Sequence, residues 1–146
     1  WGKDQVGVRL SPYGTFNGVS DSDPMNLFGQ VIEEFNKRGI VYINMIEPRA
    51  TTAGGDDNVN DKAVCTSDLF RAKFNGMFIS SGGYKPETAE VALNDNKADA
   101  IMFGRWFIAN PDLPERIAKK AELNKYDRAT FYGGDEKGYT DYPFLS

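Results

Sequence analysis

The stretches ISSGGY (residues 79–84) and AIMFGR (residues 100–105) decide the fold of this chain. Each is a short apolar run that ends in a glycine turn, and a helical pattern follows each turn. Glycine lets the backbone turn sharply and brings bare amide N–H groups close to a ligand. In a (β/α)8 barrel, the loops after strands seven and eight form a phosphate pocket of this kind. Glycines after strands are also common elsewhere, so the spacing alone leaves other turns open.

The same alternation of strand and helix continues outward through the chain. Apolar, β-branched runs predict strands, while capping residues and apolar periodicity predict helices. The strands are expected at 5–10, 40–46, 77–79 and 99–103, and the helices at 24–38, 67–74, from Pro86 onward, at 106–108 and at 115–121. Such alternation predicts four βα units with right-handed crossovers and a parallel sheet.

Two of these helices carry apolar stripes at helical spacing that we expect to face the core. The first stripe consists of Leu27, Phe28, Val31, Ile32 and Phe35, and the second of Ala89, Val91, Ala92 and Leu93. Asp23 before Pro24 predicts the start of the first helix, and Gly39 predicts its end.

Composition excludes several classes of function. The chain has 146 residues, 17 basic and 21 acidic side chains, one cysteine and no histidine. The net charge of −4 argues against a nucleic-acid partner. The missing histidine excludes a Ser-His-Asp triad or a histidine-ligated metal within this chain, and the acidic residues 56, 57 and 61 lack EF-hand spacing, so no metal site is expected. No apolar run is long enough for a membrane span and no signal peptide is evident, so we expect a cytoplasmic protein.

Arg9 and Arg105 are the two candidate cationic site residues. Arg9 lies in an apolar strand, where an arginine is costly unless it is paired, and barrel enzymes place their functional groups at the carboxyl ends of strands. The other interpretation of Arg9 is a surface arginine that faces the helices. Arg105 follows Gly104 directly and offers a planar guanidinium fork that suits phosphate oxygens.

The amino-acid sequences of these motifs closely resemble those of the Old Yellow Enzyme family. The resemblance rests on ISSGGY (79–84), FGRWFIANPDL (103–113), VRLSPYG (8–14), NKYDR with TFY (124–128 and 130–132) and GYTDYP (138–143). The family consists of flavin-dependent ene-reductases and includes the oxophytodienoate reductases and trypanosomatid prostaglandin F synthase. The matches occur in the family's order and cover most of the chain.

The resemblance implies a barrel fold of which this chain forms only a part. A (β/α)8 barrel needs at least ~200 residues and typically ~250. Residues 1–146 therefore look like the C-terminal half of a flavin-binding TIM barrel, with strands five to eight and a C-terminal tail, and the N-terminal half absent. Such a half exposes apolar faces and strand edges, so we expect it to need the missing half or to self-associate.

The resemblance also implies a function. The family takes hydride from NADPH or NADH onto FMN and reduces the C=C bond of an α,β-unsaturated carbonyl substrate. By this resemblance Gly82, Gly83, Gly104 and Arg105 hold the FMN phosphate, Arg9 contacts the flavin, and Tyr132 contacts the enone substrate. The proton-donating tyrosine and the His-His or His-Asn pair of the family belong to its N-terminal half, so no catalytic residue is expected here. Residues 50–63 would form a lid near the substrate.

Two alternatives stay open at the level of sequence. The chain could be a non-catalytic half-barrel that binds flavin or phosphate, or another phosphate-binding barrel enzyme such as an isomerase or aldolase. The latter would want a Lys or Glu at a strand end, where only Glu47 qualifies.

Overall fold

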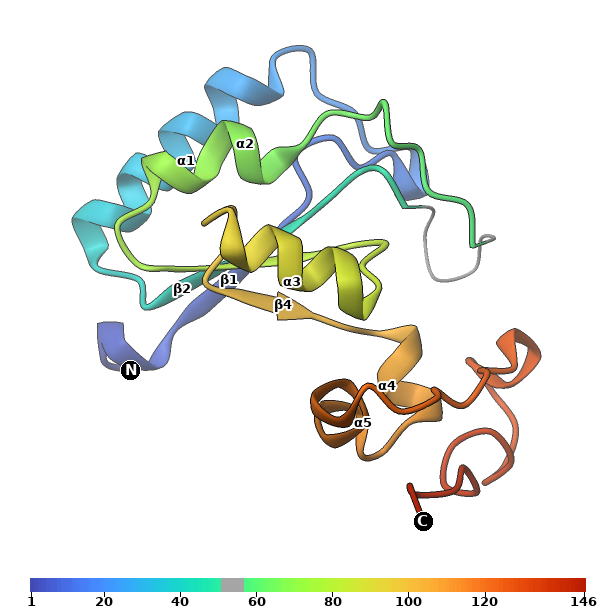
Figure 1. Cartoon of the computed structure of the whole chain (residues 1–146). Helices are drawn as coiled ribbons and strands as arrows, with labels where there is room; N and C mark the ends of the chain where they lie inside the picture. The colour runs from blue at the N-terminus through green and yellow to red at the C-terminus, as the bar shows by residue number, and fades with distance from the viewer. Residues whose placement is uncertain (51–56) are drawn as a thin grey trace. The chain divides into compact units, whose positions relative to one another are not determined.

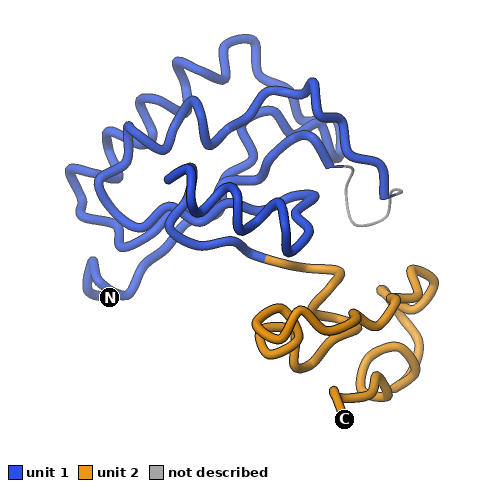
Figure 2. The backbone as a smooth tube through the Cα atoms, viewed as in Figure 1, with its two compact units in different colours: residues 1–102 blue, residues 103–146 orange. Residues whose placement is uncertain are grey.

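The computed structural model describes residues 1–50 and 57–146, which form two compact units (Figure 2). Unit 1 is Trp1–Met102 and unit 2 is Phe103–Ser146. Residues 51–56, within the predicted lid, lie outside the described residues.

Unit 1 contains a four-stranded parallel sheet with the strands in sequence order (Figure 1). The strands are β1 (Gly7–Leu10), β2 (Tyr42–Ile46), β3 (Met77–Ser81) and β4 (Ala100–Met102). The α-helices are α1 (Pro24–Arg38), α2 (Thr66–Phe70) and α3 (Pro86–Asn94), with short 3-10 helices η1 (Lys3–Gln5), η2 (Phe16–Gly18) and η3 (Arg71–Lys73). The predicted parallel α/β arrangement is confirmed.

Helix α1 begins and ends where its capping residues predict. The Asp23 carboxylate accepts a hydrogen bond from the Asn26 N–H at 3.2 Å, and Pro24 occupies the first helical position. At the other end Gly39 has φ +68°, the left-handed conformation that favours glycine after a helix. The local sequence therefore fixes this helix at both ends.

The core of unit 1 lies between the sheet and its helices. It consists of Ile32, Ile43, Met45, Phe70, Phe74, Phe78 and Ala98, all nearly inaccessible to solvent. The prediction that Leu27, Val91 and Leu93 face inward is wrong, since all three are exposed. Helix α3 meets its surroundings through the small side chains Ala89 and Ala92. At about 100° per residue, Val91 points well away from both alanines.

The opposite face of the sheet is partly open. Register pairs Arg9 with Asn44 and Asn44 with Ile79, so these side chains share one face. Tyr42, Met77 and Met102 belong to the same face by the two-residue alternation of strands, and they are 38%, 51% and 39% exposed. We call this the open face.

Unit 2 consists of two short helices and an irregular tail. Helices α4 (Arg105–Ala109) and α5 (Leu113–Lys119) are followed by the 3-10 helix η4 (Arg128–Thr130). Tyr126 packs edge-on against Trp106, with ring centroids 5.1 Å apart, and 5.5 Å from Phe131. These aromatic contacts hold the tail against α4.

A buried arginine closes the tail into a loop. Arg116 pairs with Asp112 at 2.6 Å, and its two terminal nitrogens donate to the carbonyls of Glu122 and Pro143 at 2.7 and 2.8 Å. The second Asp112 oxygen accepts from the Leu145 N–H at 2.6 Å. Burial raises the pKa of Asp112, but the hydrogen bonds from Arg116 and Leu145 outweigh it, so the net pKa is lowered.

Replacing Arg116 with methionine is expected to release the tail. The variant loses two charge-assisted hydrogen bonds to backbone carbonyls, each worth about 1.5–3 kcal/mol. Limited proteolysis should then cut residues 123–146 much faster than in the wild type. Lys119→Met is the matched control, because Lys119 also forms an i,i+4 pair at 2.6 Å on α5, but an exposed one. Equal protease resistance of the two variants would contradict the role of Arg116.

Candidate functional site

The turn after β3 is held in a conformation that requires glycine. Gly82 and Gly83 have φ values of +112° and +68°. A Cβ added at Gly82 would lie 2.7 Å from the Glu47 carbonyl oxygen. A Cβ at Gly83 would meet the side chains of Ala50 and Val59 at 3.1 Å. The backbone here is therefore packed closely on the segment after β2, with a backbone collision for a Cβ at Gly82 and a tight side-chain contact at Gly83.

The turn also presents unused donors. Among the residues that the structure describes, the N–H groups of Gly83 and Tyr84 have no hydrogen-bond acceptor. The turn follows the carboxyl end of β3, the edge at which barrel enzymes bind their ligands. Two unpaired amides at this edge suit an anion such as a phosphate.

Below the turn lies a buried carboxylate that is fully satisfied. Glu47, 1% exposed, accepts hydrogen bonds from the N–H groups of Thr66 and Ser67 at 2.7 and 3.0 Å. The hydroxyls of Ser67 and Ser80 donate to the same carboxylate at 2.5 and 3.1 Å. Buried charge is tolerated when it is hydrogen-bonded in this way. Glu47 thus joins the start of α2 to strand β3, and its donors leave little capacity to act on a substrate.

Arg49 connects this network to the glycine turn. Its Nε donates to the Gly82 carbonyl oxygen at 3.0 Å, and its guanidinium lies 4.2 Å from the centre of the Tyr84 ring. The Tyr84 hydroxyl lies 2.9 Å from the Ser80 hydroxyl, which itself donates to Glu47. Burial raises the pKa of Tyr84, with the Ser80 hydrogen bond opposing it, so the phenol stays neutral.

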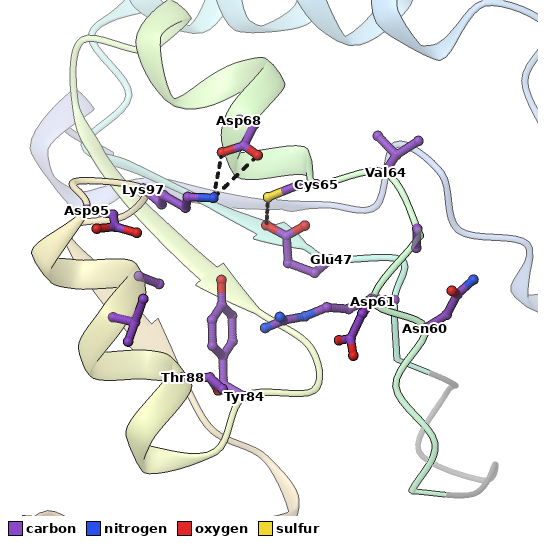
Figure 3. A pocket seen from close by; sticks show the side chains of 14 residues that line it. Glu47, Asn60, Asp61, Val64, Cys65, Asp68, Tyr84, Thr88, Asp95 and Lys97 are labelled. Atoms are coloured by element: carbon purple, nitrogen blue, oxygen red, sulfur yellow. Dashed lines mark hydrogen bonds and ion pairs between the residues drawn. The ribbon is translucent and has the colours of Figure 1, made fainter.

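A cavity of about 570 Å³ opens beside this network (Figure 3). Figure 3 shows Tyr84 between α3 and the segment that carries Asp61 to Asp68, with Lys97 paired to Asp68 at 3.1 Å. Cys65 also lines the cavity, with its thiol 3.9 Å from a Glu47 oxygen. Burial raises the pKa of the Cys65 thiol, and the negative charge of Glu47 adds to this, so a thiolate nucleophile is disfavoured.

The candidates in unit 2 lie at the start of α4 and in the tail. Gly104 is the N-cap of α4, with no atom within 4 Å of the position that a Cβ would take. Arg105 is the first residue of that helix, and its guanidinium lies 5.9 Å from the Tyr126 ring centre. Tyr132 is 71% exposed, so its ring is available for a contact.

Three of the predicted site residues belong to unit 1. Arg9 lies exposed near the end of β1, in the same sheet as the β3 turn that carries Gly82 and Gly83. Gly104, Arg105 and Tyr132 belong to unit 2, so a pocket shared by all six residues stays a prediction.

Within 1–50 and 57–146, no three His, Cys, Asp or Glu side chains gather as a metal site would require. None of the helices in the described ranges is both long and apolar enough to cross a bilayer.

The sequence of this chain matches one well-defined protein family. The pattern of the NADH:flavin oxidoreductase / NADH oxidase family covers residues 1–124. Putative 12-oxophytodienoate reductase 10 of Oryza sativa subsp. japonica is 46% identical over 99% of this chain, which spans 46% of the rice protein. 12-oxophytodienoate reductase 2 of Arabidopsis thaliana is 45% identical over 99% of this chain and 38% of its own length. The chain thus spans less than half the length of these relatives.

Solved structures give the same result. Morphinone reductase in complex with tetrahydroNAD superposes with a TM-score of 0.85 at 41% identity, over 99% of this chain and 37% of the reductase. A variant of NCR from Zymomonas mobilis superposes with a TM-score of 0.80 at 38% identity, over 99% of this chain and 44% of its own. The four βα units therefore correspond to a fragment of a TIM barrel.

Proposed function

The chain belongs to the NADH:flavin oxidoreductase / NADH oxidase family, the Old Yellow Enzymes, and from this premise we propose its specific role. The protein is an FMN-dependent NAD(P)H oxidoreductase that reduces the C=C bond of α,β-unsaturated carbonyl compounds. This chain supplies the site for the FMN phosphate. The observation that carries the proposal is the Gly82-Gly83 turn, where positive φ angles, close packing and unused amides coincide.

The residues present fit a flavin phosphate. The turn is packed so closely that a Cβ at Gly82 would meet the Glu47 carbonyl and a Cβ at Gly83 would meet Ala50 and Val59, which keeps its backbone bare. The N–H groups of Gly83 and Tyr84 have no acceptor within the described part of the chain. A phosphate needs donors and positive charge, and Arg105 offers a cationic fork.

The six candidate residues have distinct roles in binding the flavin and the substrate. Gly82, Gly83 and Gly104 let the backbone approach the phosphate, and Arg105 neutralises its charge. Arg9 places a cation against the flavin ring and stabilises negative charge there. Tyr132 lines the substrate side. When bound, FMN supplies the hydride transfer between NADPH or NADH and the enone.

The structure also bears on the isomerase or aldolase alternative. Such an enzyme would use Glu47 as its strand-end acid or base. The Glu47 carboxylate is 1% exposed and receives four hydrogen bonds from Thr66, Ser67 and Ser80. A carboxylate so occupied suits a structural role better than proton transfer, which favours the oxidoreductase.

Purification of the whole protein that contains this chain tests the proposal. We expect a yellow protein that releases FMN on denaturation and that, without oxygen, oxidises more than one equivalent of NADPH or NADH per bound FMN only when cyclohexenone is added. A colourless protein that does not bind added FMN would contradict the proposal. A yellow protein without cyclohexenone-dependent oxidation would support the flavin-binding alternative.

Residues 1–146 expressed alone are expected to self-associate. The open face exposes Tyr42, Met77 and Met102, which are 38–51% accessible to solvent. Exposed apolar patches of this kind promote association with another protein surface. β1 and β4 each have one neighbouring strand in the sheet, so both leave backbone groups for pairing. Size-exclusion chromatography with light scattering should give oligomers or aggregates. A stable monomer that does not bind a hydrophobic dye would contradict the expectation.

A further inference from the structure

We propose that Arg49 is a positioning residue for the phosphate turn, acting through the Gly82 carbonyl. The inference rests on the proposed function, because it concerns how the turn receives the FMN phosphate. Arg49 is not one of the six residues assigned to the flavin or the substrate. Its role follows from the geometry of the peptide bond it contacts.

The contact fixes the direction of a donor. The chain has no cis peptide bond among its described residues, so the bond from Gly82 to Gly83 is trans and planar. In a trans peptide the C=O and the following N–H point in opposite directions. The hydrogen bond from Arg49 Nε to the Gly82 oxygen, at 3.0 Å, therefore directs the Gly83 N–H away from Arg49.

This hydrogen bond matters because the backbone of a glycine can otherwise adopt many conformations. Gly82 and Gly83 both lie in the left-handed region, where neighbouring conformations cost little for glycine. A flexible turn would present its amides in many directions and lose entropy on binding an anion. An outside hydrogen bond removes this freedom before binding occurs.

Arg49 is itself held by a chain of buried contacts. Its guanidinium stacks on Tyr84, which is 8% exposed, and the Tyr84 hydroxyl meets Ser80. Ser80 donates to Glu47, whose own backbone N–H donates to the Ser81 carbonyl at 2.7 Å. The position of Arg49 is thus set by the buried ends of β2 and β3.

The charge of Arg49 lies against the Tyr84 ring and is not paired with a carboxylate of the described residues. In the part of the chain that the structure describes, Arg49 forms no salt bridge, and its buried Nη2 has no hydrogen-bond acceptor. An arginine kept only for stability would be expected to have acceptors for its buried nitrogens. In the described part of the chain, the hydrogen bond that the Arg49 side chain does form goes to the Gly82 carbonyl of the turn.

The test compares FMN with riboflavin, which lacks the phosphate, on the whole apoprotein. Affinities are measured by quenching of flavin fluorescence. For Arg49→Met we expect FMN binding to weaken about tenfold, the effect of one lost hydrogen bond near its upper range. Riboflavin binding should stay within about twofold, because the isoalloxazine contacts are unchanged. A general loss of structure would weaken both ligands together.

Two further variants sharpen the result. Arg49→Lys keeps the charge, but an ammonium has no fixed fork with which to bond Gly82 while lying on Tyr84, so we expect selective loss of FMN binding again. Lys97→Met is the matched control, because Lys97 lines the same cavity and is paired with Asp68 away from the turn. It should leave the ratio of the two affinities unchanged.

Each outcome decides. Selective loss of FMN binding in both Arg49 variants, with Lys97→Met unaffected, supports the inference. Proportional loss of both flavins, an unchanged ratio, full rescue by lysine, or an equal effect of Lys97→Met overturns it and leaves the proposed function standing. A wild-type apoprotein that binds FMN no more tightly than riboflavin contradicts the phosphate site itself, and the inference with it.

Discussion

Replacing Gly82 with alanine is expected to remove FMN binding and to destabilise the protein. The new Cβ would lie 2.7 Å from the Glu47 carbonyl oxygen, a backbone atom that cannot move away cheaply. The residue would also have to keep φ near +112°, which costs a non-glycine residue about 1–3 kcal/mol. Relief of either strain must shift the turn and its amides. We expect the purified variant to lose its yellow colour and to bind added FMN at least about tenfold more weakly.

Gly134→Ala separates the two causes of this loss. Gly134 has the same φ of +112°, but nothing lies within 4 Å of the position that its Cβ would take. That variant carries the conformational strain without the collision, and it lies outside the proposed phosphate site. Thermal unfolding should show a smaller decrease for Gly134→Ala, with FMN retained. Retention of FMN by Gly82→Ala would remove the main support for the phosphate site.

Replacing Arg105 with methionine is expected to weaken FMN binding about 10- to 150-fold, the range for a hydrogen bond to a charged group. Methionine replaces the apolar stem of the side chain and removes the cation that the phosphate needs. Riboflavin, which has no phosphate, should bind the variant as tightly as it binds the wild type. Titration of the apoprotein with both flavins measures the difference.

Arg128→Met is the control for this second variant. Arg128, like Arg105, lies 5.9 Å from the Tyr126 ring centre, so both variants remove a cation from the same aromatic ring. Arg128 is not part of the proposed phosphate site and should leave FMN binding within about twofold of the wild type. If both variants lost FMN equally, a general effect of charge or tail packing would explain the loss better than a phosphate contact.

The fold could be predicted because its determinants are local. Asp23, Pro24 and Gly39 define α1 through capping, and glycines after apolar runs define the turns. These effects act within a few residues and leave a mark in the sequence. The apolar stripes were less reliable, since Leu27, Val91 and Leu93 are exposed. Helical spacing indicates which side chains share a face, but the neighbours decide how wide the buried part of that face is.

The supporting contacts of the site could not be predicted from the sequence. Arg49 and Gly82 are 33 positions apart, and Glu47 and Ser67 are 20 apart. No periodicity connects residues at such separations, and a strand-end glutamate looks the same whether it is catalytic or fully hydrogen-bonded. The register of β2 against β3, which pairs Met45 with Ser80, and the position of the start of α2 beside Glu47 bring these groups together.

The hydrogen bonds of the Arg116 guanidinium affect how the length of the C-terminal segment can vary during evolution. Because it bonds to Glu122 and Pro143, residues 123–142 are an excursion between two fixed points. Doubling the length of such an excursion costs only about 0.6 kcal/mol in closure entropy. Insertions and deletions among natural variants are therefore expected at the exposed residues 133–137, while the packed rings of Tyr126 and Phe131 and the two tethered ends stay in place.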